Sequence, residues 1–180
     1  MTNASETSAR ERGLAQFRAG QYQAALQTFE KLRAQAAAAH DALALAEATN
    51  DLGVTYQALK QNERAKTNLE NAISQFAALN DDVKRGQAMG NLGTLLAEMG
   101  KYRESEIRLE QAAEIFHNAG DAQNESLTLK WLSRTHLKHW DFLGAIFAYD
   151  RALARLEPLP PEQQMLRRIL QIPLRIMMRG

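Results

Sequence analysis

Residues 50–56 of this chain, NDLGVTY, align at a spacing of forty with residues 90–96, GNLGTLL, and both stretches contain a leucine followed by a glycine. The same spacing links four small residues, Gly13, Gly53, Gly93 and Ser133. It also links two mostly alanine sets, Ala25, Ala65, Ser105, Ala145 and Leu32, Ala72, Ala112, Ala152, and one large set, Phe29, Leu69, Leu109, Tyr149. Self-similarity at a fixed period between 20 and 50 residues is typical of stacked repeat arrays. Such arrays usually hold other molecules and rarely catalyse reactions, so the repeat predicts binding without naming the partner.

The segments between these positions have the composition of helices. Alanine, leucine, glutamine, glutamate and arginine dominate, and the four prolines all lie after residue 157, so none interrupts a helix before that point. Glycines such as Gly100 suit the left-handed residue that ends a helix, and aspartates such as Asp121 suit the residue that caps the next one. The sequence predicts helices over 6–19, 22–39, 42–59, 62–79, 82–99, 102–119, 122–138 and 142–156. A turn at 158–161 then leads to a ninth helix, which Pro173 is expected to disturb.

Three glycines of the small set fall inside predicted helices. Each glycine there costs about 1 kcal/mol relative to alanine, so close approach of another backbone is the natural explanation. The first alanine set lies twelve residues later, on the partner helix of each hairpin. We therefore expect small residues to face small residues where the two helices of a hairpin meet.

This arrangement resembles the tetratricopeptide repeat (TPR) family over about residues 6–157. The second repeat fits the family pattern best, through Leu52-Gly53, Tyr56, Ala65, Leu69 and Ala72. The spacing of forty resembles the long-helix variety of kinesin light chains and bacterial regulatory scaffolds. The resemblance implies an all-α, right-handed TPR solenoid of four helical hairpins plus a C-terminal capping helix. Its implied domains are an array over 1–157, with repeats of about 6–45, 46–85, 86–125 and 126–157, followed by a proline-rich turn and an apolar, basic helix over 158–180.

In the TPR family the first helix of each hairpin lines a concave groove that holds a peptide or helix of a partner protein. Asparagine amides can bond a peptide backbone there. Lysines and arginines spaced four apart form one stripe along a helix and can pair with a carboxylate. The alternative for this stripe is a merely solvated helix face. Carried over by position, the groove residues are Asn50, Val54, Gln57, Asn91, Thr94, Glu98, Lys130, Arg134 and Lys138.

The charge of the chain is small but unevenly distributed. The formal net charge is +1, so no overall field favours nucleic acid or membrane. Residues 1–125 carry 13 Lys+Arg against 17 Asp+Glu, and residues 126–180 carry 9 against 4. The basic end suits an acidic partner, although solvated faces of a short array would give the same imbalance.

Several kinds of chemistry find no support in the sequence. The absence of cysteine excludes disulfides and thiolate sites and suits a reducing compartment. The N-terminal residues lack the basic and apolar regions of a secretory signal, and no apolar run reaches 18 residues, so a cytoplasmic protein is expected. We find no phosphate loop, nucleophile elbow or His-Glu-x-x-His motif, so we expect neither an enzyme nor a cofactor. His136 and His139 lack an obvious third metal ligand. Trp131 and Trp140 are interpreted as packing residues, not as a platform for nucleic acid.

The C-terminal segment is both apolar and basic, with four arginines against one glutamate from residue 162 onward. A stack of hairpins ends with an exposed apolar face, and a final helix that uses Met165, Ile169 and Ile172 would cover it. The alternatives are docking of a partner, self-association into a homo-oligomer, and a regulatory subunit that acts through this segment. Contact with a membrane surface is the weakest of these hypotheses.

Overall fold

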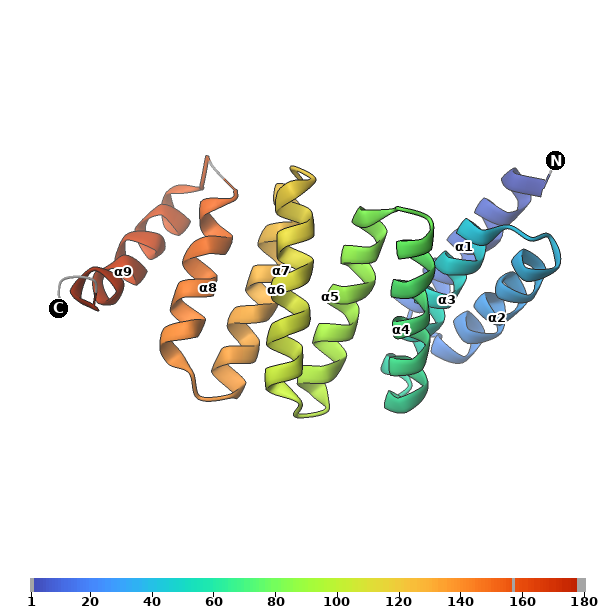
Figure 1. Ribbon diagram of the computed structural model, residues 1–180, viewed down its shortest axis with the longest axis horizontal. Coiled ribbons are helices and arrows are strands. Elements are labelled where there is room, and N and C mark those ends of the chain that lie inside the picture. Colours follow the sequence, from blue (N-terminus) through green and yellow to red (C-terminus); the bar gives the residue numbers. More distant parts are fainter. Residues whose placement is uncertain (1, 157, 178–180) are drawn as a thin grey trace. The chain divides into compact units, whose positions relative to one another are not determined.

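The computed structural model describes residues 2–156 and 158–177, and its side chains from residue 9 to residue 172 apart from residue 157. Over these residues the chain forms nine α-helices joined by short turns, with no strand (Figure 1). The helices are α1 (Thr2–Arg18), α2 (Tyr22–Ala38), α3 (Ala42–Ala58), α4 (Asn62–Ala78), α5 (Asp82–Glu98), α6 (Tyr102–Asn118), α7 (Ala122–Lys138), α8 (Phe142–Ala154) and α9 (Pro161–Met177).

The predicted helices are confirmed: α1 to α6 each end one residue earlier than predicted, and larger differences occur at three places. Helix α1 begins at Thr2 instead of residue 6, and α8 ends at Ala154 instead of residue 156. Helix α9 continues past residue 173, where the sequence predicted a disturbance. Because the proline ring fixes φ near the helical value, a proline in this position removes one backbone hydrogen bond without ending the helix.

A turn of the same kind recurs every twenty residues. A residue with positive φ ends each of the first seven helices: Gly20, His40, Lys60, Asn80, Gly100, Gly120 and Trp140. The next residue donates its backbone N–H to the carbonyl five positions back, as from Gln21 to Gln16 at 2.9 Å and from Asp141 to His136 at 2.9 Å. This pattern is the Schellman motif, which satisfies carbonyls that a helix end leaves free.

Aspartates then begin several of the helices. Their carboxylates accept the backbone N–H three residues later at 2.9–3.0 Å, as predicted for N-caps. These aspartates are Asp41, Asp81, Asp121 and Asp141. The cap hydrogen bonds to Asn124 lower the pKa of Asp121, because they favour the charged carboxylate. Turn and cap together fix the length of each helix.

The described chain divides into two compact units, one up to Leu95 and one from Leu96 onward, with the boundary inside α5. The first unit holds a buried cluster of Ala46, Ala72, Phe76 and Ala88, with Ile73 packed against it. The second holds a cluster of Leu109, Ala113, Leu129, Leu132, Ala148 and Ala152. The repeated alanine positions therefore lie in the core, as their spacing predicted.

The glycines of the small set meet a different partner from the one predicted. A Cβ at Gly53 would lie 2.7 Å from Cγ of Leu69 and 3.2 Å from its backbone nitrogen, and a Cβ at Gly13 would lie 2.6 Å from the ring of Phe29. The close approach of two helices is confirmed, but the residue opposite the glycine is large. In the fourth repeat a small residue does face a small residue, because the Ser133 hydroxyl donates to the Ala145 carbonyl at 2.8 Å.

Two glycine substitutions should move stability in opposite directions. We expect Gly53→Ala to lower the free energy of unfolding by about 1–3 kcal/mol, because Leu69 is fully buried and cannot yield to the new methyl group. Gly90→Ala should raise it by about 0.5–1 kcal/mol, because a Cβ at Gly90, inside α5, meets nothing within 4 Å. Urea unfolding followed by circular dichroism measures both. Equal effects of the two substitutions would contradict the packing described here.

Candidate functional site

In the first unit, the structure joins two of the predicted groove residues. The Asn91 side-chain amide donates to the Asn50 side-chain oxygen at 3.1 Å, between α5 and α3. The Thr94 hydroxyl donates to the Asn91 carbonyl at 2.8 Å. Val54 and Gln57 lie half-buried on α3. The two asparagines therefore form a polar pair across neighbouring repeats at this face.

The same helices carry a charge network that no pattern in the sequence had indicated. Arg10 donates to both carboxylate oxygens of Asp51, at 2.7 and 3.3 Å, and lies 3.4 Å from Glu47. Lys84 pairs with Glu47 at 3.2 Å. The Asp51 side chain is only 7% exposed, and burial raises the pKa of its carboxyl even though the guanidinium of Arg10 lowers it. Arg10, Glu47 and Lys84 thus link α1, α3 and α5.

A spacing of 41 residues would have revealed these links. It separates Arg10 from Asp51 and Asn50 from Asn91, and it also separates Glu110 from Arg151, which pair at 2.7 Å. A residue of one repeat thus contacts the residue one position further along in the next repeat. Pairs of complementary polar residues 41 positions apart in the sequence would therefore have predicted these contacts between repeats.

In the second unit, the basic stripe lies on α7 beside apolar side chains. Lys130 is half-buried, whereas Arg134 and Lys138 are exposed. Trp131 is 38% exposed and Leu127 is 53% exposed. The Arg134 guanidinium lies 4.7 Å from the centre of the Trp131 ring, a distance typical of a cation–π contact. We call Leu127, Lys130, Trp131, Arg134 and Lys138 the α7 face.

The interpretation of both tryptophans as packing residues is wrong. Trp140 is 80% exposed, at the turn after α7, and its ring meets Phe142 at 6.0 Å. Trp131 shares a side of α7 with Leu127 and Arg134, because residues spaced by three, four or seven lie on one helix face. The remaining predicted groove residue, Glu98, lies exposed at the end of α5. The structure therefore adds Leu127 and Trp131 to the predicted basic stripe.

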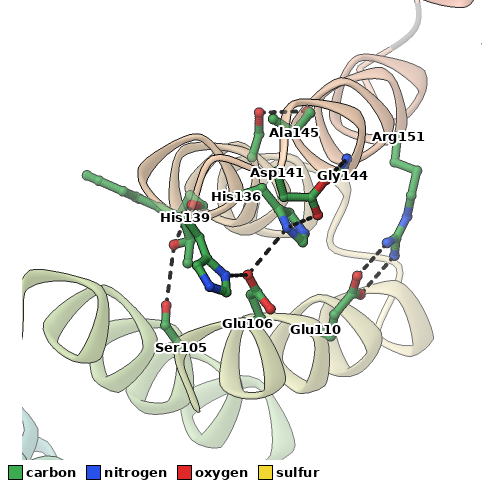
Figure 2. A network of polar contacts seen from close by, with 12 residues as sticks. Ser105, Glu106, Glu110, His136, His139, Asp141, Gly144, Ala145 and Arg151 are labelled. Carbon is green, nitrogen blue, oxygen red and sulfur yellow. Dashed lines mark hydrogen bonds and ion pairs between the residues drawn. The ribbon is translucent and has the colours of Figure 1, made fainter. Parts of the chain in front are cut away.

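Figure 2 shows a second polar network, in which Glu106 of α6 points toward two histidines of the α7 end. One oxygen of Glu106 lies 3.4 Å from Nδ1 of His136 and 3.5 Å from Nδ1 of His139. His136 also lies 3.0 Å from Asp141. No pattern in the sequence marked Glu106 or Asp141 as neighbours of the histidines. Among the described residues, no group of three or more such side chains is arranged to hold a metal ion, and the network joins α6 to α7.

The predicted cap is not formed by the residues assigned to it. Met165, Ile169 and Ile172 are 63%, 52% and 56% exposed. Helix α9 instead contacts α8 through polar side chains, with Arg167 and Gln171 each 3.2 Å from the carboxylate of Asp150. Figure 1 shows α9 leaning away from α8 beyond their connection. The side chains of residues 173–180, the rest of the predicted basic and apolar segment, lie outside the described part of the chain.

The comparisons with known proteins agree with this geometry. The model of the tetratricopeptide repeat family matches residues 46–76, which cover most of α3 and α4. The chain contains a tetratricopeptide repeat (TPR). Within the part that the structure describes, no helix is long and apolar enough to cross a membrane. No curated protein matches the sequence of this TPR protein.

Solved structures share the fold at low sequence identity. The TPR protein is similar to BtubC (BKLC) from P. vanneervenii, with a TM-score of 0.71, 17% identity, and coverage of 88% of this chain and 73% of that one. It is also similar to a Podosopora anserina protein, described as a kinesin light chain with nearly identical TPR-like repeats. That structure gives a TM-score of 0.67, 17% identity, and coverage of 93% of this chain and 95% of that one. The all-α TPR solenoid is therefore confirmed. TPR folds generally mediate protein–protein interaction and are typically non-enzymatic scaffolds.

Removing Arg10 should destabilise the TPR protein in a pH-dependent way. Arg10→Met leaves the Asp51 carboxylate buried without its partner, and we expect a loss of about 2 kcal/mol at pH 7, reduced because Arg10 is partly exposed. The folded-state pKa of Asp51 already lies above its ordinary value and rises further without Arg10. Protonation then favours the folded state, so the loss should shrink as the pH falls from 7 toward 4.

The matched control for this measurement is Arg12→Met, on the exposed side of the same helix. It should change the free energy of unfolding by less than about 0.5 kcal/mol at either pH. Urea unfolding at several pH values compares the two variants. A loss for Arg10→Met that is independent of pH would show that Asp51 does not cause it.

Proposed function

We propose that this TPR protein is a non-catalytic scaffold or adaptor that binds a peptide or helix of a partner protein. The partner lies along the faces of the first helices of the repeats, the faces that line the groove in the TPR family. The observation that carries the proposal is the α7 face. It combines exposed apolar side chains with three positive charges on one side of a single helix.

The composition of the α7 face suits a protein ligand of particular chemistry. Tryptophan and arginine are enriched among the residues that dominate binding energy at interfaces. The ring of Trp131 is already held by Arg134 at 4.7 Å, so little side-chain freedom remains to be lost on binding. A partner segment that places an apolar side chain near Leu127 and Trp131, and carboxylates near Lys130 and Lys138, would satisfy both parts of the surface.

The first unit supports the same mode of binding with polar groups. Asn50 and Asn91 present amides at the equivalent face of α3 and α5, beside Val54 and Gln57. Amide side chains can donate to and accept from a peptide backbone. Arg10 is less suited to this role, because Asp51 and Glu47 already bind its guanidinium. We assign the affinity for an acidic segment to the α7 face, and the binding of a peptide backbone to the asparagine pair of the first unit.

Reversing the charge of the α7 face should weaken partner binding. Peptides selected from a displayed random library on the immobilised chain provide the probes, and fluorescence anisotropy gives their Kd. We expect Lys130→Glu/Arg134→Glu/Lys138→Glu to weaken binding of the selected acidic peptides at least tenfold, because attraction becomes repulsion and the contact to Trp131 is lost. Raising the salt concentration should weaken binding to the unmodified chain in the same direction.

The matched control is Lys101→Glu/Arg103→Glu/Arg108→Glu, which changes the net charge equally but at the start and along the length of the second helix of a repeat, α6. This control should retain the affinity, and circular dichroism should show both variants folded. Equal affinity of the α7 variant and the unmodified chain would refute the assignment of the α7 face. Equal losses in both variants would show that only total charge matters.

A further inference from the structure

In the sequence, helix α9 stands where the first helix of a fifth repeat would be expected. The first helices of the second, third and fourth repeats begin at Ala42, Asp82 and Ala122 and end forty residues apart as well. One more period predicts a helix over about residues 162–178, and α9 extends over Pro161–Met177. By the same offset, Ile172 stands in the position of Leu52 and Leu132. The helix spacing thus continues beyond α8, with Pro173 in the place of Gly53 and Ser133.

The apolar side of α9 is open, unlike that of the other first helices. Leu52 and Leu132 are 0% and 1% exposed, whereas Ile172 is 56% exposed. Leu129 is fully buried, whereas Ile169, forty residues later, is 52% exposed. The polar edge with Arg167 and Gln171 faces Asp150 of α8 instead. Helix α9 is strongly amphipathic, and its apolar side is exposed.

In the complete repeats, this side packs against the second helix of the preceding hairpin and against the second helix of its own, as Leu129 and Leu132 do with Leu109 of α6 and Ala148 of α8. Leu69 of α4 fills the space above Gly53 of α3. In the fourth repeat, Ser126 and Ser133 of α7 donate to the carbonyls of Ala152 and Ala145 of α8, each at 2.8 Å. The covering helix thus carries small residues seven positions apart with a large apolar residue between them. In α4 these are Ala65, Leu69 and Ala72.

A second copy of this chain is poorly suited to cover α9. Its helices with the required small residues are engaged in their own hairpins, since Ala25, Ala65, Ser105 and Ala145 are at most 3% exposed. Among the described residues of α9, the apolar side chains on its open side are all large: Met165, Leu166, Ile169 and Ile172. By the same offset, Leu166 stands in the position of Ala46 and Ser126, which are small residues. A helix that packs on α9 therefore needs a small residue opposite Leu166. The exposed Arg168 beside this side favours acidic residues at the edge of that helix.

We propose that the open side of α9 binds an amphipathic helix of a different protein, which packs on α9 as the second helix of a fifth hairpin. The ligand is defined by small residues seven positions apart with a large apolar residue between them. This interface is separate from the α7 face. It depends on shape and apolar contact, whereas the α7 face depends on charge.

A helix of this chain that already has the required pattern serves as the probe. The peptide has the sequence of residues 61–79, with a lactam between side chains introduced at positions 67 and 71, which lie on the exposed side of α4. The lactam holds the peptide helical, because a free helix of this length is marginal in water. We expect saturable binding of the labelled peptide to the full chain by fluorescence anisotropy.

Variants on both sides test the proposed geometry. Ile169→Lys/Ile172→Lys should weaken binding at least tenfold, and its thermal unfolding should match that of the unmodified chain because both side chains are exposed. In the peptide, Ala65→Leu should also weaken binding at least tenfold, because a leucine at this position would keep the peptide helix from packing closely on α9. Ser74→Leu, on the exposed side of the same helix, should retain it.

Other outcomes would overturn the inference. Absence of binding would do so directly. Loss of binding in Leu127→Lys but not in the α9 variant would place the peptide on the α7 face and leave the proposed function intact. A dimer in sedimentation velocity that Ile169→Lys/Ile172→Lys dissociates would show that a second copy covers α9. Loss of acidic-peptide binding in the α7 variant tests the other surface, so the two proposals fail separately.

Discussion

The left-handed residue at every twentieth position constrains the rest of this structure. Each helix before it must end there, because an L-residue in that conformation cannot continue a right-handed helix. The turn returns the chain after the same number of residues each time, so equivalent side chains recur at a spacing of forty. Four of the seven positions hold residues other than glycine. The backbone hydrogen bonds of the turn and the aspartate caps therefore sustain the geometry even where glycine is absent.

Regular turns place one face of every first helix outside the core, and the two units use that face differently. In the first unit, Arg10, Glu47, Asp51 and Lys84 bind one another across neighbouring repeats, so the charges there stabilise the array. In the second unit, the α7 face carries three basic residues and an exposed tryptophan. Because these charges belong to one helix and have the same sign, they cannot satisfy one another. This difference, not the fold, is the reason we propose the α7 face as the binding surface.

The sequence predicted what depends on spacing along one helix and missed what depends on contacts between helices. Helix ends follow from short local signals such as glycine and aspartate, so nearly all bounds were correct to within one residue. The stripe of Lys130, Arg134 and Lys138 also follows from helical spacing. The partner of Gly53 was wrong, because the rotation of two packed helices decides whether Ala65 or Leu69 faces it. The exposure of Trp131 was missed for a related reason: an apolar residue buries itself only if another helix covers its side of α7.

Helix α9 shows how repeat register and docking can disagree. Its position in the sequence is that of a first helix, but Asp150 draws the polar edge of α9 toward α8 through Arg167 and Gln171. An ion pair that water still reaches gains little, whereas each large apolar side chain left exposed forgoes about 1.5–3 kcal/mol of burial. Contacts to α8 alone therefore leave most of the available stabilisation of α9 unused. A helix that covers Ile169 and Ile172 would supply it, and the binding energy of such a ligand would come from apolar surface that the free protein already exposes.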